Sequence, residues 1–226
     1  MIELAAFLGN PGKEYQRNRH NAGFLLAEKL PFFDALSWQK KFKGFYAAMD
    51  RARMAAYFPG GGASEPEMPA RLHFIKPETF MNLSGESVAA AASFFKIKSD
   101  SVLVVHDELE LPLGTISLKF SGGLGGHNGL RSMKACFGTA DFWRIRIGIG
   151  RPDSRLPGEG GPPGSGEGIV DWVLSDFSSA EAETLDRALK AGAELLCRAL
   201  AGNPEALLPG WAKKKIAPGD VTPQDK

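Results

Sequence analysis

The sequence predicts an α/β domain in which a twisted, mixed but mostly parallel β-sheet is flanked by α-helices on both faces. Twice an apolar run leads through a polar loop into a helical pattern, from residues 4–8 to 22–30 and from 71–76 to 88–95. In addition, residues 102–105 consist only of Val and Leu, which is typical of a strand covered on both faces. Repeated strand-to-helix steps around such strands indicate an α/β sheet.

The composition is that of one folded domain with two insertions. The chain has 226 residues, of which 43% are hydrophobic, and this is enough for one substantial core. Gly, Pro and Ser gather near 59–70 and 151–168, as is typical of flexible insertions. We therefore expect a single domain over residues 1–212, with a disordered tail at 213–226.

The two cysteines predict a cytoplasmic protein, and the overall charge neither favours nor disfavours a nucleic-acid partner. The net charge is +1, so binding to nucleic acid would depend on a local basic patch. Cys136 and Cys197 lie in apolar helical patterns, where we expect two buried, reduced thiols rather than a disulfide. No apolar run reaches the roughly 18 residues of a membrane span, and the first residues lack a cationic leader. We expect neither a membrane segment nor a signal peptide.

The first half of the chain alternates strands with polar loops. Turn dipeptides at 10–12 break the pattern after the first strand, and the helix that follows closes at Pro31. Residues 38–58 hold two short β-type runs separated by Asp50 and Arg51, which predicts a hairpin or meander.

The second half continues with strands and ends in a long helix. After a turn at 109–114, residues 115–120 form a strand, and the glycine-rich stretch 121–130 opens a helix through Cys136. Residues 144–149 alternate, so their two arginines should share one face. Ser178 and Glu181 have capping-box spacing at the start of an amphipathic helix.

Polar side chains follow three of these strands. Ligand sites in open α/β sheets lie beyond the carboxyl ends of the strands, so the loops there should bring together Asn10, His20, Asn82 and Asp107. His20 with Asp107 is the minimal pair for general-base chemistry, because the carboxylate fixes one ring N–H and leaves the other nitrogen free. No GxSxG motif is present and neither cysteine lies in these loops, so water is the expected nucleophile.

Three asparagines and a glycine-rich stretch complete the candidate site. Asn10, Asn82 and Asn128 are neutral amides, suited to hold a carbonyl, a ribose hydroxyl or a developing oxyanion. The stretch SGGLGGHNG fits neither the P-loop nor the dinucleotide-binding pattern. It is equally consistent with a tight turn and with an anion cradle at a helix N-terminus.

The spacing of the histidines matches no common zinc motif. His20, His106, His127 and Asp107 could ligate zinc, but the chain has no HExxH motif and no CxxC pair. We therefore predict no metal and no cofactor. His73 lies mid-strand and is expected to be structural, and His106 should point to the sheet face opposite Asp107.

Four motifs together resemble one known family. GNPGKEYQRNRHNAGF, KPETFMNLSGESV, VVHDELELPLGTISLKFSGGLGGHNGLRSM and FWRIRIGIGRP, in this order from Leu4 to Arg151, are similar to bacterial-type peptidyl-tRNA hydrolase. The resemblance implies hydrolysis of the ester between a peptide and the 3′-terminal ribose of tRNA. It also implies a monomer without an obligate protein partner.

The resemblance implies a role for each matched residue. His20 is the base that activates water, and Asp107 orients it. The substrate-binding positions are Asn10, Tyr15, Phe80, Met81, Asn82, His127 and Asn128, with Tyr15 near the terminal nucleotide of the CCA end. Lys119, Arg144 and Arg146 match the patch that binds tRNA phosphates toward the acceptor stem. A position that is often basic in the family is Ser117 here, so Arg131 or Lys134 could complete the patch.

Two rival interpretations come from other classes. Homologues of this fold in plant organelles act as RNA-binding partners in intron splicing without hydrolysis, although no transit peptide is evident here. The other rival is a nucleoside-processing enzyme of related architecture. This sequence shows no phosphate-plus-base pocket motif that would support it. An assay on peptidyl-tRNA separates the first rival from the hydrolase.

Overall fold

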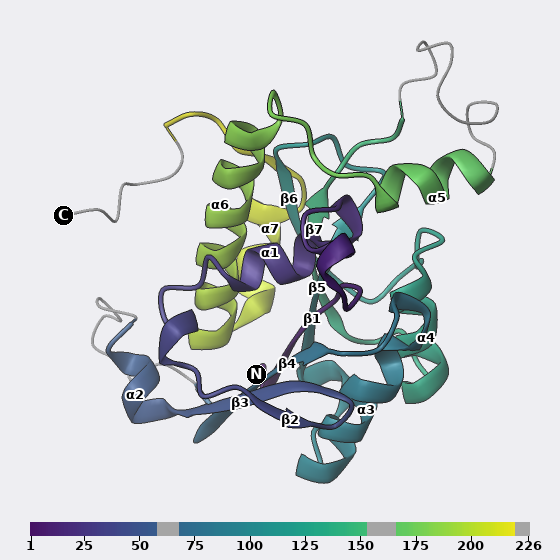
Figure 1. Ribbon diagram of the computed structural model, residues 1–226. Helices are drawn as coiled ribbons and strands as arrows, with labels where there is room; N and C mark the ends of the chain where they lie inside the picture. Colours follow the sequence, from purple (N-terminus) through teal and green to yellow (C-terminus); the bar gives the residue numbers. More distant parts are fainter. Residues whose placement is uncertain (58–67, 153–165, 220–226) are drawn as a thin grey trace.

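Within the residues that the structure describes, the sheet has eight strands and carries helices on both faces. A computed structural model describes residues 1–57, 68–152 and 166–219 (Figure 1). The spatial order of the strands is β2-β3-β4-β1-β5-β7-β6-β8. Their bounds are β1 (Leu4–Phe7), β2 (Gln39–Lys41), β3 (Gly44–Asp50), β4 (Arg71–Pro77), β5 (Val102–Glu108), β6 (Thr115–Phe120), β7 (Trp143–Gly148) and β8 (Lys214–Lys215).

The centre of the sheet is parallel and its flanks are antiparallel. β1 pairs in parallel with β4 and β5, and β5 pairs in parallel with β7. β3 and β2 extend one side, and β6 and β8 the other, by antiparallel pairs. The mixed α/β sheet is thus confirmed, and its parallel part is confined to the four central strands.

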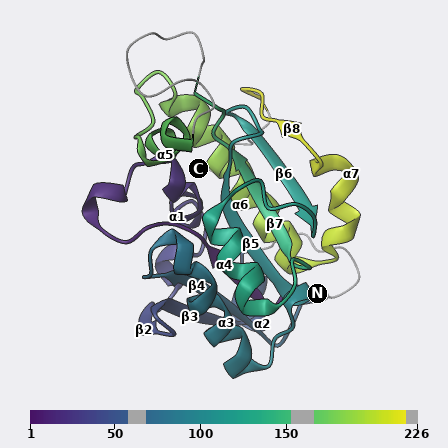
Figure 2. The same ribbon diagram turned by 90° about the vertical axis from the view of Figure 1, so that its right-hand side faces the viewer.

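The helices form two layers, which Figures 1 and 2 show on opposite sides of β1 and β5. Alternate residues of β1 and β5 face each layer, as expected of strands buried on both faces. The helical segments are η1 (Lys13–Tyr15), η2 (Arg19–Asn21), α1 (Ala22–Ala27), η3 (Phe33–Ala35), α2 (Arg51–Ala55), η4 (Met81–Leu83), α3 (Ser84–Phe95), η5 (Ser99–Ser101), α4 (Asn128–Phe137), α5 (Gly166–Leu174), α6 (Ala182–Ala201), η6 (Pro204–Leu207) and α7 (Leu208–Trp211).

Each layer packs on its own apolar cluster. Ala5, Phe7 and Val105 belong to the cluster that includes residues of α1 and α6. Leu4 and Ala6 belong to the cluster that includes residues of α3 and α4. In the described part of the chain, no helix is long and apolar enough to cross a membrane.

The region 38–58 corrects one expectation. The hairpin exists, but it joins β2 to β3, and its turn residues Phe42 and Lys43 have φ values of 56° and 53°. The prediction of a second strand over residues 52–58 is wrong, because Arg51–Ala55 is helix α2. Ala, Arg and Met are good helix formers, and this propensity outweighs the short apolar alternation.

The C-terminal segment corrects another. Lys214 and Lys215 form β8 against β6, and the Ile216 side chain is buried. The prediction of a disordered tail is therefore wrong for residues 214–216, because a buried isoleucine and a strand pairing hold this segment on the sheet. Part of the expected insertion 151–168 also belongs to α5, and 153–165 lies outside the described residues, as do 58–67 and 220–226. The single-domain boundaries stay a prediction.

The two cysteines differ from each other. Cys197 is buried in α6 and Cys136 is exposed on α4, and both are free thiols. Both cysteines are free, as predicted, whereas the prediction that Cys136 is buried is wrong. Its helix α4 is amphipathic, and Cys136 lies outside the buried stripe formed by Leu130 and Met133.

Candidate active site

The ends of β1, β4 and β5 carry the candidate site. A glycine brings the first helix down onto these ends, because a Cβ atom on Gly23 would lie 2.5 Å from the Leu8 carbonyl oxygen and 2.6 Å from that of Val105. Only a residue without a side chain fits this approach. His20, three residues earlier in η2, is thereby held at the end of β5, where Asp107 lies.

His20 and Asp107 form a buried hydrogen-bonded pair. His20 Nδ1 lies 2.9 Å from Asp107 Oδ1, and the two residues are 8% and 2% exposed. With Nδ1–H donating to the carboxylate, Nε2 is left as the proton acceptor. Burial opposes the charged ring, but the Asp107 charge and hydrogen bond outweigh it and raise the pKa of His20. Burial likewise opposes the Asp107 anion, yet His20 and His127 hold its pKa well below the usual range.

His127 binds the same carboxylate oxygen. Its Nε2 lies 2.9 Å from Asp107 Oδ1, and its Nδ1 accepts the backbone N–H groups of Gly129 (3.1 Å) and Leu130 (3.4 Å). His127 is thus the N-cap of α4, and this fixes the tautomer in which Nε2–H donates to Asp107. From the sequence we expected a substrate-binding role for His127. Its position immediately before the helical pattern was the signal for the cap.

His106 lies behind this group and stays neutral. Its Nδ1 donates to the Asp107 carbonyl oxygen at 2.6 Å, and its ring centre is 4.9 Å from that of His127. Burial and the nearby His127 lower the pKa of His106 well below its ordinary value. In β5, His106 points to the same face of the sheet as Val102 and Val104, and this face packs on α3 and α4. A neutral ring therefore supports the histidine that caps α4.

Asn10 is fixed by three hydrogen bonds. Its backbone N–H and carbonyl are bound by the side chain of Asn21, at 2.8 and 3.0 Å, and its Oδ1 accepts the Met81 N–H at 2.7 Å. Its Nδ2 group makes no hydrogen bond within the described part of the chain. Asn21, the residue after His20, therefore holds the segment that carries the Asn10 amide, and no sequence motif marks this role.

The other expected substrate positions surround this core. Tyr15 and Phe80 meet edge to face with ring centres 6.5 Å apart, and Phe80 is 56% exposed. Met81 is buried, whereas Asn82 and Asn128 are exposed. Asn82 follows the residue bound to Asn10, and Asn128 follows the N-cap His127. Both amides are thus available on the segments that flank the buried pair.

The expected basic residues lie on β6 and β7 in unequal settings. Arg146 donates to Glu108 Oε2 at 2.9 Å and to Ser117 Oγ at 3.4 Å. Burial, followed by the charges of Arg144 and Arg146, lowers the pKa of Lys119. A hollow of about 290 Å³ is lined by Ser117, Lys119 and Arg146, with residues of α7 nearby.

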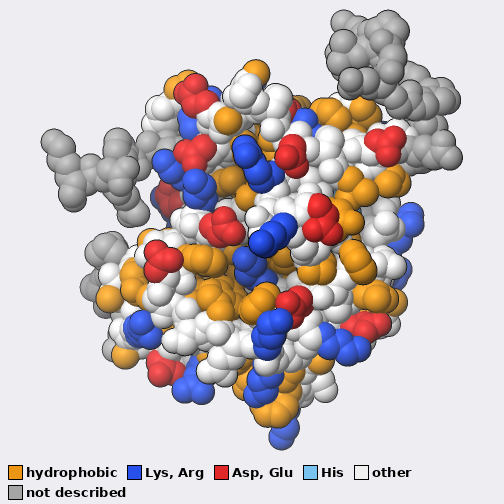
Figure 3. Space-filling model, viewed as in Figure 1, with side chains coloured by type: hydrophobic (Ala, Val, Ile, Leu, Met, Phe, Trp, Pro, Cys, Tyr) orange, Lys and Arg blue, Asp and Glu red, His pale blue; other side chains and the backbone are white. Residues whose placement is uncertain are grey.

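Arg144 differs from the expectation of a phosphate contact. It is 2% exposed, and its Nη1 donates to the Gly123 carbonyl oxygen at 2.8 Å, which ties the glycine-rich loop to β7. Ser117 is also buried and its hydroxyl donates to the Ala212 carbonyl oxygen. On the face shown in Figure 3, basic and acidic side chains are interspersed, and no large patch of one charge is visible there.

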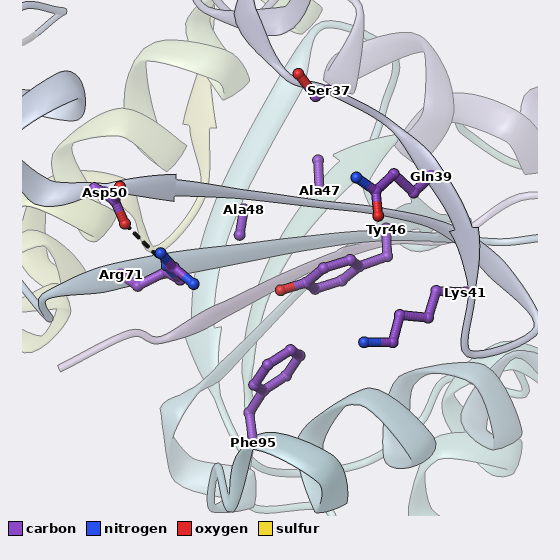
Figure 4. Close-up of a pocket in the computed structure, with 9 residues that line it drawn as sticks. All are labelled: Ser37, Gln39, Lys41, Tyr46, Ala47, Ala48, Asp50, Arg71 and Phe95. Atoms are coloured by element: carbon purple, nitrogen blue, oxygen red, sulfur yellow. Dashed lines mark hydrogen bonds and ion pairs between the residues drawn. The ribbon is translucent and has the colours of Figure 1, made fainter.

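A second cavity, of about 360 Å³, lies over β3 and is drawn in Figure 4. Tyr46 and Phe95 form its aromatic wall, and Asp50 pairs with Arg71 at one end. Tyr46 Oη lies 2.7 Å from His73 Nδ1, and the His73 ring stacks on Phe95. Burial, then the Arg71 charge, lowers the pKa of His73 to about 4, in agreement with a structural role.

One group of side chains has the make-up of a metal site. The ligand atoms of His20, Asp107 and His127 lie within 4.8 Å of one another. However, both histidines already donate to the Asp107 oxygen, and the other His127 nitrogen caps α4. A metal ion between them would replace these hydrogen bonds, so the absence of a metal stays our prediction.

A buried histidine–carboxylate pair at the carboxyl edge of an α/β sheet is the arrangement of an oriented general base, as in many enzymes. Among the described residues, no serine or cysteine is hydrogen-bonded to His20. The family model "Peptidyl-tRNA hydrolase" matches residues 4–218, and the chain belongs to this family.

Individual relatives agree with this assignment. The peptidyl-tRNA hydrolase of Treponema pallidum is 43% identical, over 95% of this chain and 96% of the relative. That of Neisseria meningitidis serogroup A is 40% identical, over 90% and 93%. A crystal structure of a peptidyl-tRNA hydrolase with N-propanol has a TM-score of 0.75 at 31% identity, covering 96% and 97%. The enzyme from Acinetobacter baumannii has a TM-score of 0.68 at 32% identity, covering 92% and 91%.

Proposed function

We propose that the protein hydrolyses the ester bond between the peptide and the 3′-terminal ribose of peptidyl-tRNA, releasing free tRNA during translation. The observation that carries this proposal is the 2.9 Å contact between His20 Nδ1 and Asp107 Oδ1, which leaves His20 Nε2 as a base. The chain's membership in the peptidyl-tRNA hydrolase family supports the choice of substrate.

His20 acts first as a base and then as an acid. Nε2 takes a proton from water as the water oxygen bonds to the ester carbonyl carbon. The Asp107 anion stabilises the imidazolium that forms, and its lowered pKa keeps it ionised throughout. When the tetrahedral intermediate collapses, the bond from carbon to the ribose 3′ oxygen breaks, and His20 returns its proton to that oxygen.

Amide groups hold the reacting ester. The Nδ2 of Asn10 is the best-oriented donor, because Asn21 and the Met81 N–H fix the rest of that residue. Asn82 and Asn128 bind the substrate from the two flanking segments. Tyr15 and the exposed Phe80 provide an aromatic surface on which the terminal base can stack. Met81, which is buried next to Phe80 in the chain, would line the site beneath this surface.

Phosphate recognition belongs to Lys119 and Arg146. Both line the hollow beside α7, and each can meet a phosphate of the CCA end or the acceptor stem. The buried Arg144 acts on phosphate through its charge and on the glycine-rich loop through Gly123. We further propose that the enzyme works as a monomer in the cytoplasm, without a metal or an obligate protein partner.

The test compares the parent protein with His20→Ala on purified peptidyl-tRNA. The parent should release free tRNA, and the variant should lose about 10² to 10⁴ in kcat while binding tRNA nearly as well. A parent protein that binds tRNA but does not cleave it would favour the RNA-binding alternative. Equal rates for parent and variant would remove His20 from the role of base.

A further inference from the structure

Arg19 precedes His20 in the 3-10 turn η2, and it faces the connection between α5 and α6. This side chain is 4% exposed. Its Nη1 and Nη2 bind the two carboxylate oxygens of Glu181, at 3.0 and 2.9 Å. A two-point bond of this kind fixes direction as well as distance.

Two aromatic rings hold the same guanidinium group. Its central carbon lies 3.8 Å from the Trp172 ring centre and 4.7 Å from that of Phe177. Its Nε donates to Ser175 Oγ at 3.3 Å. The set Arg19, Trp172, Phe177 and Glu181 is called the Arg19 clamp below. In Figures 1 and 2, α5 lies beside the loop that leads into α1, in agreement with these contacts.

The partners of Arg19 are themselves anchored. Glu181 accepts the backbone N–H and the hydroxyl of Ser178, each at 2.8 Å, and these bonds hold the start of α6. The Trp172 indole N–H donates to the Gly150 carbonyl oxygen at 2.8 Å, just after β7. The clamp therefore connects η2 to rigid parts of the sheet and helix layer.

The turn η2 is consequently fixed at both ends. On one side of His20, Asn21 binds the backbone of Asn10, and on the other side Arg19 binds Glu181. The Arg19 side chain is buried, and that of Glu181 is 24% exposed. An ion pair largely withdrawn from water adds little net stability compared with apolar packing, and its best-attested use is to specify one geometry. Here the geometry specified is that of the turn that carries the base.

We infer that Arg19 is a positioning residue for His20, and that the Arg19 clamp holds His20 Nδ1 within hydrogen-bonding distance of Asp107. This inference rests on the proposed function, in which His20 is the base. Arg19 itself does not touch the reacting atoms.

The conservative variants Arg19→Lys and Glu181→Gln test the inference. Lysine keeps the charge but cannot bind two oxygens in one plane or stack flat on Trp172. Both variants should fold, lose about 10- to 100-fold in kcat and keep KM within about threefold, because misplacement by about 1 Å is costly to catalysis. The His20 pKa in the kcat–pH profile should move down toward its ordinary value as the Asp107 contact loosens.

The matched control is Arg198→Lys. Arg198 pairs with Glu194 on the exposed side of α6, so kcat and the pH profile should remain those of the parent. In a His20→Ala background, Arg19→Lys should cause no further loss of rate, because Arg19 acts through His20.

Four results would overturn the inference. One is a variant with the parent kcat and pH profile, and another is a rise in KM alone, which would indicate a phosphate contact. A third is a loss of rate that follows only the fraction of unfolded protein, measured by circular dichroism, with an unshifted pH profile. The fourth is a further loss of rate in the His20→Ala background. If the parent protein itself fails to cleave peptidyl-tRNA, the proposed function fails instead.

Discussion

His127 Nε2 lies 2.9 Å from Asp107 Oδ1, the same oxygen that accepts the hydrogen bond from His20. Because His127 Nδ1 accepts two backbone N–H groups of α4, the single N–H proton of the neutral ring is on Nε2. The start of α4 is thus connected through one imidazole to the carboxylate that orients the base.

The two roles of His127 can be separated by substitution. Asparagine caps helices well but is too short to reach Asp107, so His127→Asn should lower kcat about 10-fold with little change in the free energy of unfolding. His127→Ala removes the cap as well and should cost about 1 kcal/mol more in urea unfolding. Equal kcat for His127→Asn and the parent would show that the bond to Asp107 has no part in orienting His20.

Activity and stability should respond to pH in opposite directions near the His20 pKa. Acidification through this raised pKa protonates the base, so kcat/KM should fall. The bond with Asp107 raises the folded-state pKa above the ordinary 6.5, so the stabilisation by His20 is fully present below 6.5 and lost as pH rises through the folded value. Asp107 contributes above its ordinary value of 3.8, and this contribution is lost only as pH falls through its lowered pKa.

Just below pH 6.5 the enzyme should therefore be poorly active yet at its most stable with respect to this pair. Urea unfolding of the parent and of His20→Gln, at pH 6 to 9 in steps, measures the effect. The difference in unfolding free energy between the two proteins should grow as pH falls. A difference that shrinks on acidification would contradict the assigned sign.

Gly23 should tolerate no side chain. An added Cβ would meet the backbone oxygens of Leu8 and Val105, neither of which can move without shifting a strand. We expect Gly23→Ala to lower the free energy of unfolding by about 1–3 kcal/mol and to reduce kcat of the folded fraction. Gly210→Ala is the control, since nothing lies within 4 Å of its added Cβ in α7. Parent-like stability for Gly23→Ala would mean that α1 approaches the strands less closely.

Lys119 should contribute one phosphate contact to tRNA binding. Lys119→Ala should weaken binding and reduce the slope of log K against log salt by about 0.7 to 0.9. Lys190→Ala, an exposed lysine of α6 paired with Asp186, should leave that slope unchanged. Identical slopes for Lys119→Ala and the parent would remove Lys119 from the tRNA interface.

Much of this arrangement could be predicted from the sequence. Buried runs and polar loops place His20 and Asp107 at neighbouring strand ends, and the rule for ligand sites in α/β sheets brings them together. The charge patterns of 144–149 predict that Arg144 and Arg146 share a face. They cannot predict that Arg144 is buried under the glycine-rich loop, because burial depends on how that loop folds back over β7.

For other features, local sequence patterns give a wrong prediction or none. Residues 52–58 look like a strand by local alternation, and only their helical propensity explains α2. The pairing of β8 and the two-point bond of Arg19 join residues far apart in the chain. Capping-box spacing marks Glu181 as a residue at a helix start, but it gives no sign of the bond to Arg19. Sequence patterns therefore point to the candidate base His20 and to Asp107, whereas the contacts that hold these residues follow only from the structure.

The bond between Arg19 and Glu181 also bears on how the enzyme comes into being. It joins positions 162 residues apart, so it is absent from a nascent chain that has not yet reached residue 181. By then β1, β4, β5 and β7, which form the parallel centre of the sheet, have all been synthesised. The turn that carries His20 is therefore secured only after all the strands that carry its partners have been made.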